Sequence, residues 1–201
     1  MSARVERKNR ATVEAIVEAA EHLLAERGVA AVTLEAVADR ADVAVQTIYN
    51  RVGGRPAVLR AVAESALAAN HRYLDAAHAT PGGPLERIEA VAEAYVRFAL
   101  ERPDQYRLLA FPPADAPAPE RVVELVQEQN GKLARLVAEA RDAGLIRPDL
   151  DPDEMATVLW RVWDGVLGLM FRPDALRPSD DQLRSILQTT RSIGELGIPP
   201  R

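Results

Sequence analysis

Two carboxamide side chains, Gln46 and Asn50, stand four positions apart in the short segment VAVQTIYNR. In a short helix over 45–51, Val45 and Ile48 can face inward, and the two amides would then face outward. Each amide can donate and accept a hydrogen bond, as the edge of adenine requires, and Thr47 could contact the methyl group of thymine. Tyr49 and Arg51 could hold phosphates. The segment therefore carries side chains suited to binding duplex DNA.

The neighbouring segments predict the elements that would position these side chains. Thr33 can cap a short helix, and Asp42–Val43 separates that helix from another over 45–51. A longer helix precedes these two short helices and ends at Gly28. It is predicted by six apolar residues at helical spacing: Val13, Ile16, Val17, Ala20, Leu23 and Leu24. This arrangement is a helix-turn-helix. The same spacing also occurs in helical hairpins that bind nothing, so an incidental hairpin is the alternative.

The charge of the chain is unevenly distributed. The 201 residues include 30 acidic and 25 basic side chains, which give a formal net charge of −5. Residues 1–10 and 40–60 each carry four basic side chains against one acidic one, whereas residues 61–201 carry 16 basic and 22 acidic ones. Contact with phosphate requires a local basic surface, whatever the total charge. The two basic segments therefore favour a DNA-binding N-terminal part.

Composition excludes several kinds of site. The chain has no cysteine, which excludes disulfides, thiolate zinc sites and cysteine nucleophiles and fits a cytoplasmic location. The longest apolar stretch, 155–171, contains Arg161 and Asp164, and the N-terminus lacks an apolar signal core, so we expect no membrane segment. The histidines lack metal-ligand spacing, and no hydrolase, phosphate-loop or dinucleotide motif occurs. We expect no metal, no cofactor and no enzymatic activity.

The remainder of the chain also predicts helices, and hence an all-α protein. The pattern Asp151-Pro152-Asp153-Glu154 is a strong helix start, with a capping carboxylate followed by proline at the first helical position. Prolines and glycines separate the predicted helices, which cover residues 56–79, 85–102, 104–111, 120–143, 152–171 and 180–194.

Aromatic and charged residues on these helices are candidates for a ligand site, although most would also suit a helical core. Arg97 and Asp164, on otherwise apolar helices, could hold a polar ligand or pair with each other. The candidate ligand-binding residues are Tyr95, Arg97, Phe98, Phe111, Trp160, Trp163 and Asp164.

The last two predicted helices carry more apolar positions than one internal face requires, which predicts a homodimer. Gly165 and Gly168 would allow close approach of another helix. The candidate interface residues are Leu159, Val162, Val166, Leu169, Leu183, Ile186, Leu187, Thr190 and Ile193.

Segment 10–60 resembles the N-terminal domain of TetR-type (tetracycline-repressor-like) transcriptional regulators. The rest of the chain matches that family only in layout. The resemblance lies in Ala19-Ala20, Gly28, Thr33–Ala38, Ala41-Asp42-Val43, Thr47-Ile48-Tyr49 and Arg55–Leu59.

The resemblance implies an N-terminal three-helix helix-turn-helix domain, residues 1–55, and a C-terminal helical-bundle regulatory domain for ligand binding and dimerisation, residues 56–201. Thr33 would cap the helix that lies across the DNA backbone, and Tyr49 and Arg55 would contact phosphate. Ala44 stands where the family usually has a capping serine, which removes a cap worth about 1 kcal/mol. The implied DNA-binding residues are Thr33, Ala44, Val45, Gln46, Thr47, Tyr49, Asn50, Arg51 and Arg55.

These observations predict a ligand-responsive, sequence-specific transcriptional regulator, most simply a repressor that a small molecule releases from its operator. A homodimer would place two recognition helices in successive major grooves, about 34–36 Å apart, and read a pseudo-palindromic operator in double-stranded DNA. The alternative is an all-helical ligand-binding or enzymatic protein with an incidental helix-turn-helix-like hairpin.

Overall fold

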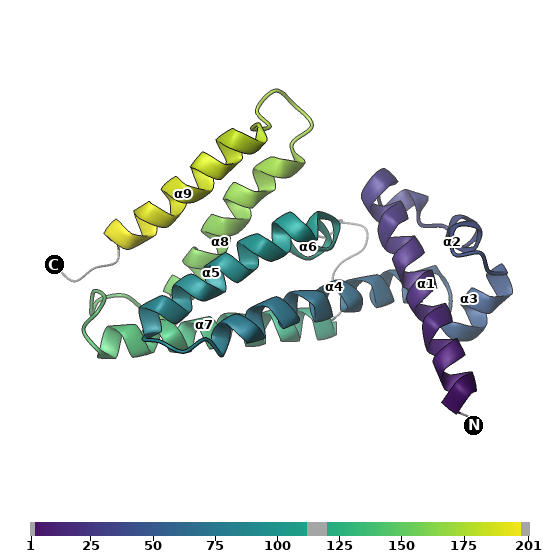
Figure 1. Cartoon of the computed structure of the whole chain (residues 1–201), viewed down its shortest axis with the longest axis horizontal. Coiled ribbons are helices and arrows are strands. Elements are labelled where there is room, and N and C mark those ends of the chain that lie inside the picture. The colour runs from purple at the N-terminus through teal and green to yellow at the C-terminus, as the bar shows by residue number, and fades with distance from the viewer. Residues whose placement is uncertain (1–2, 112–119, 198–201) are drawn as a thin grey trace. The chain divides into compact units, whose positions relative to one another are not determined.

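The computed structural model describes residues 3–111 and 120–197 (Figure 1). Within these ranges all regular structure is helical, which confirms the all-α prediction. The short 3-10 helices Val29–Ala31 and Leu169–Phe171 accompany nine α-helices in the described residues: α1 (Ala3–Arg27), α2 (Leu34–Arg40), α3 (Val45–Arg51), α4 (Arg55–His78), α5 (Pro84–Glu101), α6 (Pro103–Ala110), α7 (Glu120–Asp142), α8 (Pro152–Gly168) and α9 (Asp180–Gly197).

The chain forms two compact units. The first comprises Met1–Ala69 and Arg102–Val123, and the second comprises Asn70–Glu101 and Glu124–Arg201. These units are defined by packing, whereas the predicted domains 1–55 and 56–201 are defined by function, so the functional boundary stays a prediction.

The core of the first unit joins α1, α2, α3 and the first half of α4. Ile16 of α1, Val37 of α2 and Ile48 of α3 are completely buried in one apolar cluster, together with Val58 of α4. The predicted apolar face of the first helix accounts for most of the α1 contribution, because its six residues are buried or half-buried. Burying each such side chain stabilises the folded chain by roughly 1.5–3 kcal/mol. This cluster therefore holds the short helices α2 and α3 in place.

The helix α6 returns to the first unit and packs against α1. Gln105 donates a hydrogen bond from Nε2 to Glu21 Oε2 over 3.1 Å. Tyr106 is completely buried and meets Phe111 edge-on, with ring centroids 6.2 Å apart. Local periodicity predicted this helix over 104–111, but not the unit to which it belongs.

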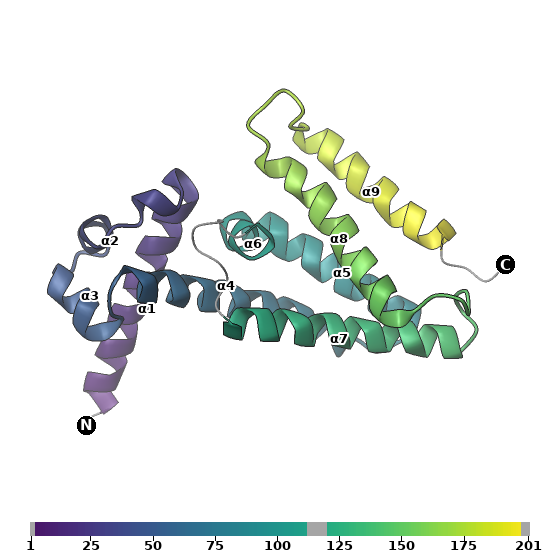
Figure 2. The same ribbon diagram turned by 180° about the vertical axis from the view of Figure 1, so that it is seen from behind.

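The second unit is a bundle of the last part of α4 with α5, α7, α8 and α9. Leu74 of α4, Val91 of α5 and Leu136 of α7 share one buried cluster. The helix α8 begins as predicted, because Asp151 accepts hydrogen bonds from the backbone N–H groups of Asp153 and Glu154, both 3.0 Å long. The helices α8 and α9 form an antiparallel hairpin, visible from both sides (Figures 1 and 2). No helix in the described residues is long and apolar enough to cross a membrane.

Candidate nucleic-acid interface

The helix α3 is fixed to the first unit along one side only. Ile48 is completely buried, and Val45 and Val52 at either end of the helix are half-buried against the same cluster. The turn before α3 places Asp42 at a φ of +51°, a left-handed conformation that aspartate tolerates better than most residues. The backbone N–H of Val43 donates to Ala38 O over 3.0 Å and closes the turn. This seating leaves the opposite side of α3 available to a partner.

The exposed side of α3 carries the side chains that the sequence singled out. Gln46, Tyr49, Asn50 and Arg51 are exposed, and Tyr49 retains 52% of its accessible surface. Gln46 donates from Nε2 to Asn50 Oδ1 over 3.1 Å, so the two amides lie on one face of α3. Thr47 is half-buried. Each amide keeps hydrogen-bonding groups for a base edge, since the mutual bond uses one donor and one acceptor lone pair. Their contact with bases stays a prediction.

The two short helices begin differently. Thr33 Oγ1 accepts a hydrogen bond from the backbone N–H of Ala36 over 3.1 Å, which caps α2 as expected. Ala44 stands at the cap position of α3 with extended backbone and no side-chain cap. The α3 N-terminus therefore lacks a stabilising contact that α2 has.

Ala44→Ser should supply the missing cap, because the Ala44 backbone already has the extended conformation of a capping residue. We expect the free energy of unfolding to rise by about 0.5–1 kcal/mol, measured by urea denaturation. Thr33→Ala is the matched control and should lower it by a similar amount. A lower stability for Ala44→Ser would show that residue 44 is not the N-cap of α3.

Arg55 is held inside the first unit. Its guanidinium donates from Nε to Val32 O over 2.8 Å and from Nη2 to Val29 O over 2.7 Å. The side chain thereby joins the start of α4 to the 3-10 turn after α1. Two of its five N–H donors are consumed, and the predicted phosphate contact would have to use the remaining donors on Nη1 and Nη2.

Arg55→Ala should lower the free energy of unfolding by about 1.5–3 kcal/mol, since it removes two hydrogen bonds from a charged donor. The carbonyl of Val32 loses this partner, whereas the carbonyl of Val29 keeps its bond from the backbone N–H of Val32. Thermal unfolding measures this change. If Arg55 also holds phosphate, the slope of log affinity for DNA against log salt should decrease by about 1 for each subunit. An unchanged slope would show that Arg55 does not contact phosphate and that its role is structural.

The basic charge of the 40–60 segment is partly compensated within the unit. Arg40 forms a two-pronged ion pair with Glu26 of α1, at 2.7 and 2.8 Å, and this hydrogen bonding holds the pKa of Glu26 below its usual value. Arg40 therefore fixes α2 to α1, and the excess charge counted from sequence overstates what the surface offers a phosphate. Arg51 and Arg60 remain exposed.

Three of the predicted ligand-binding residues meet in the second unit. Trp160 donates from Nε1 to Tyr95 Oη over 3.0 Å, and Tyr95 Oη donates to Asp164 Oδ1 over 2.7 Å. Asp164 is only 4% exposed, and its Oδ2 accepts from Arg161 Nη1 over 3.2 Å. Arg161, which also lies over the Trp160 ring at 4.5 Å, was missed as a site residue. Its spacing of three from Asp164 was the available signal.

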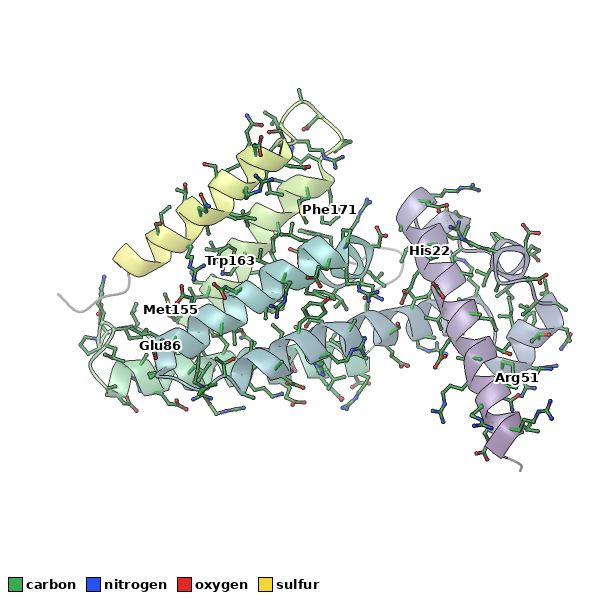
Figure 3. The ribbon with its side chains drawn as sticks, viewed as in Figure 1. His22, Arg51, Glu86, Met155, Trp163 and Phe171 are labelled. Atoms are coloured by element: carbon green, nitrogen blue, oxygen red, sulfur yellow. The ribbon has the colours of Figure 1, made fainter. Side chains whose placement is uncertain are left out.

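The other ligand candidates lie apart from this network. Phe98 is completely buried and meets Tyr73 edge-on at 5.5 Å, and the Arg97 guanidinium lies 5.7 Å from the same Tyr73 ring. Trp163 is half-buried on α8 (Figure 3). Phe111 belongs to the first unit. Ligand binding by these seven residues stays a prediction.

The predicted dimer residues divide into buried and exposed groups within one subunit. Leu183 is 8% exposed and packs inside its own unit, whereas Val162 and Ile193 are 45% and 64% exposed. Val158, one turn before Val162, is 54% exposed and was not predicted. A Cβ at Gly165 would meet no atom within 4 Å, so this side of α8 is open. The remaining residues of the set are half-buried: Leu159, Val166, Leu169, Ile186, Leu187 and Thr190.

Comparisons with known proteins match both units. A family model described as bacterial regulatory proteins, tetR family, matches residues 16–65, and one described as tetracyclin repressor-like, C-terminal domain, matches residues 88–189. No curated protein sequence matches the chain.

Solved structures share the fold over nearly the whole chain. The ketosteroid transcriptional regulator KstR2 of Mycobacterium tuberculosis is 21% identical, with a TM-score of 0.71 and coverage of 94% of this chain and 95% of that one. A TetR/AcrR-family regulator from Thermobifida fusca is 24% identical, with a TM-score of 0.68 and coverage of 90% and 94%. AibR, solved with isovaleryl coenzyme A and operator DNA, is 18% identical, with a TM-score of 0.73 and coverage of 89% and 97%.

Proposed function

We propose a function from one established premise: the chain belongs to the TetR family of bacterial regulatory proteins, and it is a DNA-binding transcriptional regulator. The finer proposal is that α3 reads an operator, that the chain acts as a homodimer, and that a small molecule bound to the second unit releases it from DNA. Repression is the proposed sign of control. No catalytic step is needed for this function.

The observation that best supports operator reading is the one-sided seating of α3. Ile48 is buried while Gln46 and Asn50 are exposed and hydrogen-bonded to each other. A helix that enters a major groove needs such a division, with an apolar side on its own domain and a polar side on the bases. The incidental hairpin considered above would have no requirement for paired amides on the exposed side.

Operator binding is tested by selecting duplexes from a random pool with the wild-type chain and measuring fluorescence anisotropy. We expect a selected sequence with two related half-sites, bound at least about 10³-fold more tightly than unrelated duplex DNA. Selection that yields no sequence preference would refute operator reading.

The proposed effector site is the network of Tyr95, Trp160 and Asp164. A buried carboxylate and two aromatic side chains could orient a ligand with both polar and apolar parts. If the ligand displaces the bond between Trp160 and Tyr95, the equilibrium shifts toward a conformation with lower DNA affinity. Acyl-coenzyme A thioesters are a reasonable first set of probes, because AibR was solved with isovaleryl coenzyme A.

Tryptophan fluorescence gives a local readout of this site, because both tryptophans of the chain, Trp160 and Trp163, lie on α8. A ligand at the network should change the emission of the Trp163→Phe variant, which retains Trp160, and should also lower DNA affinity. A probe that lowers DNA affinity without changing this emission would place the effector elsewhere.

A further inference from the structure

The first turns of α1 extend outside the core of the first unit. The helix begins at Ala3, but its first buried side chain is Ile16. At about 1.5 Å per residue, the residues before Ile16 add roughly 20 Å of helix. Arg4, Arg7, Lys8 and Arg10 all lie in this part and are exposed. This part of α1 contributes little to the core, so its charges need another explanation.

Three of the basic residues share one side of the helix. Arg7 and Lys8 follow Arg4 by three and four positions, and such positions are neighbours on a helical surface. Glu6, the acidic residue among them, lies roughly 160° around the helix from Arg4 and Lys8. In the part of the chain that the structure describes, no side-chain hydrogen bond or ion pair engages these three side chains.

This arrangement is unfavourable for the isolated subunit. Like charges at helical spacings of three and four repel one another, and cations in the first turns of a helix oppose its dipole. Helix without tertiary packing is also marginally stable at this length. An anionic partner along this side of the helix would offset both the repulsion among the three cations and their unfavourable interaction with the helix dipole.

The helix α1, which carries the basic turns, is packed against α3 within the first unit. Ile16 and Ile48 share the buried cluster, so α1 and α3 are packed together. In Figure 3, Arg51 at the end of α3 lies toward the N-terminal end of α1, whereas His22 lies toward the other end. A helix in a major groove has phosphates of both strands beside it, so a basic helix next to α3 would face the DNA backbone.

We propose that Arg4, Arg7 and Lys8 form a second phosphate-binding surface that holds the backbone of duplex DNA beside the base pairs contacted by α3. The proposal rests on the proposed DNA-binding function. Phosphate contacts carry no sequence information, so this surface raises affinity and salt dependence and does not choose the operator. It would strengthen binding to unrelated DNA as much as binding to the operator.

The test is a triple variant, Arg4→Gln with Arg7→Gln and Lys8→Gln, which removes the charges and retains good helix formers. A matched control, Arg141→Gln with Arg147→Gln and Arg184→Gln, removes the same number of charges from the second unit. The DNA probes are a duplex selected by the wild-type chain and an unrelated duplex. Affinity for each is measured by anisotropy across salt concentrations, and circular dichroism checks helix content.

Three lost phosphate contacts should lower the log–log salt slope by about 2.7 for each bound subunit. Between about 50 and 200 mM salt, the wild-type chain should lose about 40-fold more affinity per subunit than the triple variant. The operator and unrelated duplexes should be affected equally. Arg4→Lys with Arg7→Lys should retain the wild-type slope, because the charge alone is required.

An unchanged slope in the triple variant, with wild-type binding to the selected duplex intact, would overturn this inference and leave the proposed function standing. A loss confined to the selected duplex would also overturn it, because it would indicate base contact. A wild-type chain that selects no duplex from the pool and does not bind the unrelated one would refute the proposed function itself. An equal change of slope in the matched control would show that the effect comes from the overall charge of the chain. It would overturn the assignment of phosphate binding to Arg4, Arg7 and Lys8.

Discussion

Replacing Gln46 and Asn50 together by alanine should lower affinity for the selected operator by about 10²-fold or more and leave affinity for unrelated DNA nearly unchanged. Each amide that bonds a base edge in a bidentate manner contributes roughly 1–3 kcal/mol of discrimination. Both side chains are exposed, so their removal should not affect the core around Ile48. Anisotropy with the two duplexes, and urea denaturation of the variant, provide the measurements.

The single variants add information because Gln46 donates to Asn50 in the free chain. Loss of either partner also frees the other to reorient, so the two effects should not add. Gln46→Glu is a useful companion, since it keeps the size of the side chain and replaces donors by acceptors. An equal fall in affinity for both duplexes would mean that these residues hold the backbone and do not read bases.

Val162→Asp together with Ile193→Asp should dissociate the dimer and lower operator affinity by about 10²–10⁴-fold, the gain expected from linking two half-sites. Both side chains are exposed in the single subunit, at 45% and 64%, so the charges cost little in the folded monomer. In a dimer they would be buried without partners, which is strongly unfavourable. Ile186→Asp is a less clean choice, because Ile186 is half-buried in its own subunit.

Leu176→Asp is the matched control, because Leu176 is 71% exposed and lies between α8 and α9, outside the predicted interface. Light scattering coupled to size exclusion should give about twice the chain mass of 21.9 kDa for the wild type and the control, and the single mass for the double variant. A wild-type mass near 21.9 kDa at micromolar concentration would refute the homodimer.

Local patterns in the sequence were sufficient to predict the helices and the residues on the exposed side of α3. The predicted helix over 45–51 has the bounds of α3, and Asp42, Thr33 and Asp151 play the turn and cap roles expected of them. These features depend on residues within a turn or two of one another, so residue type and spacing determine them directly. The exposed side of α3 follows from the same periodicity, because burying Ile48 exposes Gln46 and Asn50.

Which residues far apart in the sequence contact one another is shown only by the tertiary structure. The guanidinium of Arg55, a predicted phosphate ligand, also binds the carbonyls of Val32 and Val29, which are 23 and 26 positions away. Arg40 is paired with Glu26 from another helix.

The path of the chain also brings Tyr95 to Trp160 and Asp164, across 65 and 69 positions, while Phe111 belongs to the other unit. Periodicity shows which side of a helix is apolar, but not which helix it meets. The pairing of distant polar groups therefore requires the folded chain.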